Sequence, residues 1–301
     1  MSIYGGVPRQ PPFRNTDCKR NCREWEIACC KIFILSLYIY KHIMGKTIST
    51  KPLPSHERIN SYLFVAETGL GKTYKAEQIL QKELSHIDEN NRFLVCPTFN
   101  FDKTLGTYFK NEDLVFEKMN DEFIPAILKL IEKDREEVYD KHHFKYDKNY
   151  IKIKIPRAKN TEPYNEFVLM LDDCIQYLGG KKQSFNNLTT LFTKNRHYGL
   201  HLLISAQYYK AAHPAIRTNC RQLFLWNTNL AESKKICDEQ CQMRNKQDFL
   251  DYFRFITKPE YSSFHIDNKK RGINKYDNDI SFKEFTILRD AGEIYSDSES
   301  D

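Results

Sequence analysis

The 301-residue chain lacks several features that would place it in a specialised structural class. It has no internal repeat and no long low-complexity run, which excludes solenoids and propellers. It also has no basic segment followed directly by an apolar core and a small-residue cleavage site, the pattern of a secretory signal. With 41% hydrophobic and 13% aromatic residues, the chain is nevertheless long and apolar enough to bury a sizeable core.

The one hydrophobic stretch worth comparing with a membrane helix runs from Ile27 to Met44. Lys31 interrupts it, and its uncharged centre extends only from Ile32 to Tyr40. About 20 apolar residues are needed to span a bilayer. We therefore expect no stable transmembrane span and favour a helix that is buried or faces a partner. Contact with a membrane surface is the alternative.

Positive charge is concentrated at the start of the chain. The formal net charge is +6, and residues 1–60 contain ten Lys or Arg and four Asp or Glu, so the remainder is balanced. We expect residues 1–50 to form a basic, partly disordered N-terminal extension with one apolar helix. Residues 290–301 are rich in acids and contain no Lys or Arg, which predicts a disordered solvating tail. Binding to basic surfaces of the same protein, or docking onto a partner, is the alternative role of this tail.

The nine cysteines are interpreted as reduced thiols that are mostly packed in the interior, because no secretory signal precedes them. A zinc site is conceivable, but neither cluster has a second matched pair or a histidine at ligand spacing. The clustered cysteines are Cys18, Cys22, Cys29 and Cys30 near the start, and Cys237 with Cys241 further along.

From residue 51 onward, short apolar runs alternate with helical patterns, which is typical of an α/β fold with a mostly parallel sheet and helices on both faces. We expect a core over residues 51–230. Residues 231–289 either complete this core or form a small accessory subdomain. The predicted strands are Tyr62–Val65, Phe93–Cys96, Phe167–Leu171, Leu200–Ser205 and Leu223–Trp226, and the predicted helices are Lys72–Leu84, Leu114–Tyr139 with an interruption at Pro125, and Asn187–Asn195.

A glycine-rich turn follows the first of these strands and leads directly into the first helix. Residues 63–73 read LFVAETGLGKT, and the strand–turn–helix context is what a Walker A phosphate-binding loop requires. Backbone N–H groups of such a turn, together with the positive end of the following helix, bind phosphate oxygens. Ala66 stands where the motif usually has its first glycine, and only a small side chain is needed there. An incidental glycine turn is the alternative.

This loop predicts a P-loop NTPase that binds ATP. Lys72 is expected to reach the β- and γ-phosphates, and the Thr73 hydroxyl is expected to coordinate Mg²⁺. The predicted nucleotide-binding residues are Ala66, Glu67, Thr68, Gly69, Leu70, Gly71, Lys72 and Thr73.

Two adjacent carboxylates, Asp172 and Asp173, end the apolar strand Phe167–Leu171 in the manner of a Walker B motif. We expect this strand to lie beside the strand of the phosphate-binding loop, with Asp172 holding Mg²⁺ through water and Asp173 polarising the attacking water. Many proteins with such a catalytic acid have Glu at the second position, and Asp is one methylene shorter. A pair of aspartates that caps the next helix is the alternative.

Gln207 ends the next apolar strand in the same way. A side-chain amide at this place contacts both the γ-phosphate and the attacking water, and so acts as a sensor of hydrolysis. Taken alone, a glutamine after a strand is more often a solvent-facing loop residue.

The three motifs together resemble those of the poxvirus-type DNA-packaging ATPases of large DNA viruses and related mobile elements, which belong to the FtsK/HerA superfamily of P-loop translocases. The likeness covers about residues 55–230 and includes residues 195–199 (NRHYG), 207–208 (QY) and 216–219 (IRTN). It implies a homo-oligomeric ring that hydrolyses ATP to drive double-stranded DNA into a capsid. Partners in the capsid or inner membrane of a virion, and a location in the host-cell cytoplasm, its viral factory or the virion, are implied with it.

In such rings, an arginine from the neighbouring subunit usually meets the charge that develops on the transferred phosphoryl group. Arg196 and Arg217 are the candidates. Each is equally suited to cap a helix or to form an ion pair within its own domain.

The basic segment 141–159 is expected to contact DNA. It contains seven Lys or Arg and two His against one Asp, and such side chains bind duplex phosphates without reading sequence. A charged insertion without a partner is the alternative. The turn at residues 179–182 (GGKK) is a second candidate. The predicted DNA-contacting residues are Lys152, Lys154, Arg157, Lys181 and Lys182.

Two other functions are compatible with a phosphate-binding loop. A small-molecule or nucleotide kinase would share the fold. It would, however, require a lid with a phosphate-binding arginine and would not need a basic insertion. A nucleotide-gated assembly or membrane-docking factor would use the loop as a switch without turnover.

Overall fold

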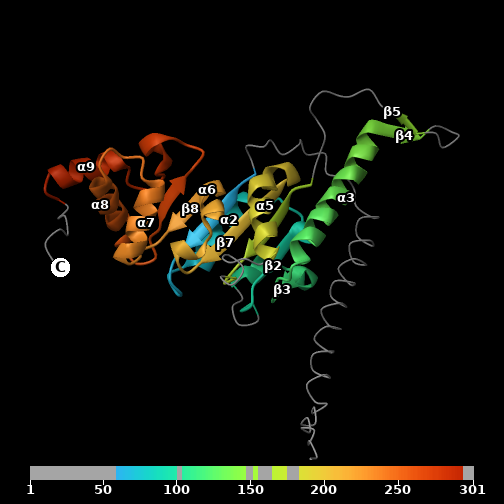
Figure 1. Cartoon of the computed structure of the whole chain (residues 1–301), viewed down its shortest axis with the longest axis horizontal. Coiled ribbons are helices and arrows are strands. Elements are labelled where there is room, and N and C mark those ends of the chain that lie inside the picture. Colours follow the sequence, from blue (N-terminus) through green and yellow to red (C-terminus); the bar gives the residue numbers. More distant parts are fainter. Residues whose placement is uncertain (1–58, 100–103, 147–151, 155–164, 175–182, 294–301) are drawn as a thin grey trace, which may run out of the picture. The chain divides into compact units, whose positions relative to one another are not determined.

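The computed structural model describes residues 59–99, 104–146, 152–154, 165–174 and 183–293 (Figure 1). The chain divides into two compact units, residues 1–46 and 47–301, and the first lies outside the described residues. The predicted N-terminal extension and acidic tail therefore lie largely outside them as well. The main strands are β1 (Ser61–Val65), β2 (Arg92–Val95), β3 (Val115–Phe116), β6 (Phe167–Leu171), β7 (Leu200–Ala206), β8 (Gln222–Leu225) and β9 (Phe264–Asp267). The helices are α2 (Lys72–Glu83), α3 (Phe123–His143), α5 (Gln183–Tyr198), α6 (Pro214–Asn219), α7 (Leu230–Gln240), α8 (Lys246–Thr257) and α9 (Phe282–Asp290).

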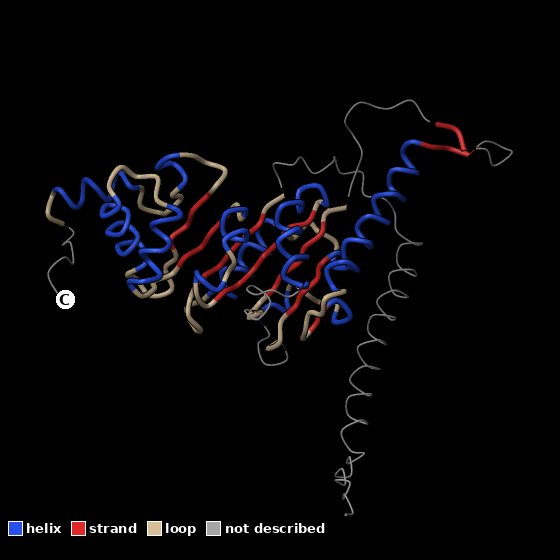
Figure 2. The backbone as a smooth tube through the Cα atoms, viewed as in Figure 1, coloured by secondary structure: helices blue, strands red, loops and turns tan. Residues whose placement is uncertain are grey.

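The strands form one seven-stranded sheet in the order β3-β2-β6-β7-β1-β8-β9 (Figure 2). Neighbours from β3 to β8 pair in parallel, and β9 adds antiparallel to β8. With helices joining these strands, the protein has the α/β architecture of P-loop NTPases, as predicted. The C-terminal part of the chain contributes β9 to the same sheet.

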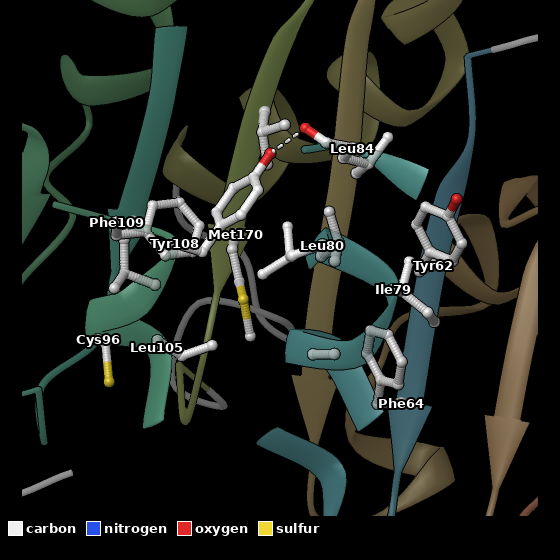
Figure 3. Packing of buried hydrophobic residues seen from close by; sticks show 14 of the residues in the cluster. Tyr62, Phe64, Ile79, Leu80, Leu84, Cys96, Leu105, Tyr108, Phe109 and Met170 are labelled. Atoms are coloured by element: carbon white, nitrogen blue, oxygen red, sulfur yellow. Dashed lines mark hydrogen bonds between the residues drawn. The ribbon is translucent and has the colours of Figure 1, made fainter. Parts of the chain in front are cut away.

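Both faces of the sheet are buried. On one face, Ile79 and Leu80 of α2 and its C-cap residue Leu84 pack against Tyr62 and Phe64 of β1 (Figure 3). The hydroxyl of Tyr108 donates a hydrogen bond of 2.8 Å to the carbonyl of Leu84, which is drawn in the same figure. Because side chains alternate along a strand, the residues between these point to the other face. Leu63 and Val65 are fully buried there.

The predicted boundaries of the strands agree with the structure to within one or two residues, and Phe167–Leu171 matches as predicted. The predicted helix start at Leu114 and the interruption at Pro125 are both wrong, because Val115–Phe116 forms strand β3 and α3 begins at Phe123, with Pro125 in its first turn. A proline is tolerated there, since first-turn N–H groups have no partner within the helix. The expected adjacency of the Asp172 strand and the P-loop strand is also wrong, because β7 lies between β6 and β1.

The basic segment includes a short hairpin that continues from α3. Strands β4 (Phe144–Tyr146) and β5 (Lys152–Lys154) pair antiparallel and form a separate two-stranded sheet. Within the described part of the chain, no helix is long and apolar enough to cross a membrane.

Candidate active site

The loop between β1 and α2 has the backbone conformation of a phosphate-binding turn. Gly69 and Gly71 have φ angles of 88° and 90°, a left-handed region that glycine adopts without steric cost. Gly71 is the N-cap of α2 and has no side chain to occupy the first-turn N–H groups of the helix. These N–H groups and the positive end of α2 therefore face the loop as donors for an anion.

Lys72 is held inside this loop. Its ammonium donates hydrogen bonds to the carbonyl oxygens of Ala66 and Glu67, at 2.6 and 3.0 Å. The side chain is only 6% exposed. Burial lowers the pKa of Lys72, although the nearby carboxylates of Asp173 and Asp172 act in the opposite direction. The ammonium is thus poorly compensated at this position, and an additional negative charge nearby would stabilise it.

Asp172 lies directly opposite the start of α2. Its Oδ2 accepts a hydrogen bond of 3.3 Å from the hydroxyl of Thr73, and its Oδ1 accepts one from Ser205. The side chain is 3% exposed. Burial raises the pKa of Asp172, the neighbouring charge of Asp173 raises it further, and the two hydroxyl hydrogen bonds only partly oppose this. The structure therefore brings Thr73 and Asp172, the two predicted Mg²⁺ ligands, into contact.

Asp173 occupies a strained backbone position. Its φ of 49° is uncommon for any residue with a side chain, although Asp adopts it more readily than most. The Asp173 N–H donates a hydrogen bond of 3.0 Å to Ser205 Oγ. Residues held in this region cluster at functional sites, where the surrounding structure supports the strain.

Ser205 is a site residue that the sequence analysis missed. It contacts both aspartates, through its hydroxyl to Asp172 and through the N–H of Asp173. The strand register explains why: Leu171 of β6 pairs with Ile204 of β7, so the next residues of each strand lie side by side. A serine at the end of an otherwise apolar strand, two positions before the predicted sensor, was the available signal.

Gln207 follows β7 at the same edge of the sheet. Val65 pairs with Ala206, and the N–H of Ala66 donates to the Ala206 carbonyl at 3.2 Å. Gln207 is therefore next to the first residues of the phosphate-binding loop and is partly exposed. Parallel strands place the loop, the two aspartates and Gln207 at one carboxyl edge, where ligands bind in such sheets.

The two predicted trans-acting arginines lie in different surroundings. Arg196 is exposed in the last turn of α5, which ends at the amino edge of β7 and so at the opposite edge from Asp172. Arg217 is 3% exposed, and two of its guanidinium nitrogens donate to the Glu239 carboxylate at 2.6 and 2.8 Å. Its remaining nitrogen donates to the carbonyls of Tyr209 and Ala212. Arg217 thus forms an ion pair within its own domain, one of the alternatives expected from the sequence.

The predicted DNA contacts fall mainly outside the described residues. Arg157, Lys181 and Lys182 lie there, whereas Lys152 and Lys154 are on β5, where only the backbone is described. Among the cysteines, Cys237 and Cys241 are free thiols. Within the described residues, no group of three or more His, Cys, Asp or Glu side chains is arranged to hold a metal ion.

Comparison with known proteins gives one sequence relative and several structures. No family model matches the chain. The uncharacterized protein 075L of Invertebrate iridescent virus 6 is 30% identical over 133 residues, which are 42% of this chain and 50% of the relative. The chain thus matches half the length of this curated relative.

Among solved structures, the genome packaging NTPase B204 of Sulfolobus turreted icosahedral virus 2, in complex with AMP, is 13% identical. It aligns with 70% of this chain and 94% of its own, with a TM-score of 0.46. The cytoplasmic domain of the type VII secretion ATPase EccC of Thermomonospora curvata is also 13% identical. It aligns with 72% of this chain and 23% of its own, with a TM-score of 0.44. At these identities and TM-scores, neither likeness indicates a function for this chain.

Proposed function

We propose that the chain is an ATP-driven double-stranded DNA translocase that packages a viral genome into a capsid. One observation carries the proposal: Thr73 Oγ1 lies 3.3 Å from Asp172 Oδ2, although the two residues come from separate motifs at one edge of the sheet. This geometry supports ATP hydrolysis. The resemblance of the motifs to those of packaging ATPases supports DNA as the polymer that is moved.

In this proposal the residues at the carboxyl edge divide the work of hydrolysis. The N–H groups of the loop and Lys72 bind the phosphates and neutralise charge that develops on the γ-phosphoryl group. Asp173 orients the attacking water and accepts its proton. Gln207 contacts the γ-phosphate and reports whether it is still attached. Ser205 positions Asp172 and Asp173 relative to each other.

The donor set at this edge fits Mg²⁺. The metal prefers hard oxygen ligands, and the Thr73 hydroxyl and the Asp172 carboxylate are two oxygen groups that already meet. A divalent cation would also stabilise the ionised form of Asp172, which burial disfavours. Thr73 and Asp172 are therefore the residues that would hold Mg²⁺, which would neutralise phosphate charge during transfer.

The proposal includes assembly and location. A homo-oligomeric ring would bring Arg196 of one subunit to the site of the next, since Arg196 is exposed and lies at the edge of the sheet away from its own site. The basic segment, with Lys152 and Lys154, and the lysines of residues 179–182 would contact the duplex backbone. A packaging motor of this kind would act in the host-cell cytoplasm or the virion, with a capsid or inner-membrane partner.

The test is ATP turnover by the purified protein with and without linear double-stranded DNA. We expect DNA to raise turnover severalfold. Asp173→Asn should lower it about 100-fold while leaving ATP binding in place, because the base acts in the chemical step. Asp113→Asn is the matched control, since Asp113 is an exposed aspartate in a short turn away from the site.

Two results would contradict the proposal. Turnover that does not respond to DNA would favour a kinase that transfers the phosphoryl group to a small molecule. ATP binding without turnover above that of Asp173→Asn would favour a nucleotide-gated assembly factor.

A further inference from the structure

A cavity of about 850 Å³ opens beside the phosphate-binding loop, away from the paired aspartates. Its lining includes Gly71 of the loop, Tyr74 and Lys75 of α2, and Phe224 of β8. In the sheet order, β8 is on one side of β1, whereas β7 and β6 are on the other. The loop after β1 thus separates two regions, the aspartate pair on one side and this cavity on the other.

Aromatic rings form part of the cavity wall, beside polar and charged side chains such as Lys75, Lys258 and Asp277. Tyr74 and Tyr261 line it, and each is 61% exposed, a large fraction for rings next to a glycine-rich loop. Deeper in the cavity, the rings of Phe224 and His265 stack with centroids 4.3 Å apart and an interplanar angle of 8°. The Lys75 ammonium lies 5.2 Å from the centre of the Phe224 ring. Flat rings at the mouth and in the interior suit a flat aromatic ligand.

Tyr261 is held over the loop by a strained backbone. Its φ of 63° lies in the left-handed region, which is rare for a bulky residue. The buried indole of Trp226 donates a hydrogen bond of 3.1 Å to the Tyr261 carbonyl and anchors this conformation. The Tyr261 ring lies 3.7 Å from the point where a Cβ on Gly71 would stand. The strained backbone of Tyr261 therefore holds an exposed ring against Gly71, the last glycine of the loop.

A triphosphate bound by the loop has a defined direction. The phosphate to be hydrolysed must face Asp172 and Asp173, on the β7 and β6 side of β1. The nucleoside at the other end of the phosphate chain then leaves the loop toward β8, where Gly71 borders the cavity. The cavity is large enough for a nucleoside, and its lining combines aromatic rings with polar groups, as a site for a base and sugar requires.

We propose that this cavity binds the purine nucleoside of the nucleotide, with the base stacked on Tyr261 and bordered by Tyr74. This inference rests on the proposed function only in requiring that the loop binds a triphosphate. It assigns to the C-terminal part of the chain, residues 258–265 in particular, a role in nucleotide binding that the sequence motifs do not contain.

The test compares the affinities of two ligands, ATP and inorganic tripolyphosphate, each measured by calorimetry without DNA. Wild-type protein should bind ATP at least tenfold more tightly than tripolyphosphate. Tyr261→Ala should weaken ATP binding about tenfold, in line with the effect of removing a base-stacking ring, and leave tripolyphosphate binding unchanged. Tyr261→Phe keeps the ring and should bind ATP as wild type does. Ile287→Ala removes an exposed apolar side chain outside the cavity and should keep the wild-type preference for ATP.

Each other outcome has a distinct meaning. Equal affinity of wild type for ATP and tripolyphosphate, or an unchanged ATP preference in Tyr261→Ala, would overturn the nucleoside site while leaving the phosphate site intact. Failure of wild type to bind either ligand would overturn the phosphate site and, with it, this inference. Because both measurements are made without DNA, a protein that binds ATP through Tyr261 but does not respond to DNA would support the nucleoside site and contradict only the translocase.

Discussion

Two groups of buried charge in this molecule differ in the direction of their pKa shifts. At the carboxyl edge of the sheet, burial lowers the pKa of Lys72 and raises that of Asp172, so both shifts favour the neutral form. Between α6 and α7, burial likewise favours the neutral forms of Arg217 and Glu239. Their mutual hydrogen bonds outweigh it, so the pKa of Arg217 is raised and that of Glu239 falls to about 2.

The difference separates a binding site from a structural ion pair. Arg217 and Glu239 bond each other at 2.6 and 2.8 Å, and Lys235 and the Tyr209 hydroxyl add to the compensation of the carboxylate. Lys72 donates to two loop carbonyls, and Asp172 accepts from two hydroxyls and the Cys96 thiol, so within the described part of the chain neither has a counter-ion in direct contact. A phosphate and a divalent cation would supply the missing charges. Charges that burial disfavours are thus kept where a ligand compensates them.

The largest expected effect is a loss of ATP turnover on replacing Lys72, with no accompanying loss of stability. Lys72→Met keeps the aliphatic stem and removes the ammonium, so ATP turnover should fall at least 100-fold. The free energy of unfolding without nucleotide should stay the same or rise, because the variant no longer buries a poorly compensated charge. Turnover assays and urea denaturation measure the two quantities. Lys82→Met, an exposed lysine on the same helix, should change neither.

If Lys72→Met lost more than about 1 kcal/mol of stability, Lys72 would belong with the structural ion pairs and the comparison would fail.

Arg217 should show the reverse pattern. Arg217→Met leaves the Glu239 carboxylate largely buried without its main partner, which should cost about 3 kcal/mol of unfolding free energy. Lys235→Met removes the more exposed partner of Glu239 and should cost well under about 1 kcal/mol. Turnover of the folded Arg217→Met protein should remain close to that of wild type. Arg196→Ala is expected to lower turnover without changing stability.

Loss of turnover at full stability in Arg217→Met would return this residue to the trans-acting role that its sequence position suggested. Urea denaturation and turnover measured on the same preparations decide between the two roles.

The residues at the carboxyl edge of the sheet can be predicted from the sequence, because each of them belongs to a short local motif. The loop at residues 66–73 carries its own turn residues, and the apolar runs before Asp172 and Gln207 mark strand ends that a parallel sheet brings to one edge. The order of the strands in the sheet cannot be predicted from these local patterns. The position of β7 between β6 and β1, and with it the contacts of Ser205, depends on how distant segments pack.

Long-range pairing explains the remaining differences. Arg217 is interpreted differently once Glu239 is known to lie beside it, but nothing in the local pattern of either residue indicates the other. The same holds for the cavity next to Gly71, because Tyr261, which forms part of its wall, is distant from the loop in the sequence. These contacts depend on tertiary packing, which local periodicity does not encode.

The smallest expected effect concerns pH and Asp172. A carboxyl whose pKa is raised in the folded protein contributes stability that is complete below its unfolded pKa, about 3.9, and is lost as the pH rises through the folded value. Without Mg²⁺ and near neutral pH, Asp172→Asn should therefore be more stable than wild type, and the difference should shrink as the medium is acidified. Asp113→Asn, a substitution at an exposed position away from the site, is the control for the change from Asp to Asn.

Mg²⁺ should reverse this order, because the ion binds the ionised carboxylate of the folded wild type and has no equivalent ligand in Asp172→Asn. Urea denaturation of both proteins at several pH values, with EDTA and then with millimolar Mg²⁺, measures the effect. Mg²⁺-dependent turnover should also decline on acidification at a higher pH than an ordinary aspartate would give, since protonation of Asp172 removes a ligand. Equal stability of the two proteins in EDTA at every pH would mean that Asp172 is compensated within the chain, as Glu239 is by Arg217, and the distinction between the two groups of charge would not hold.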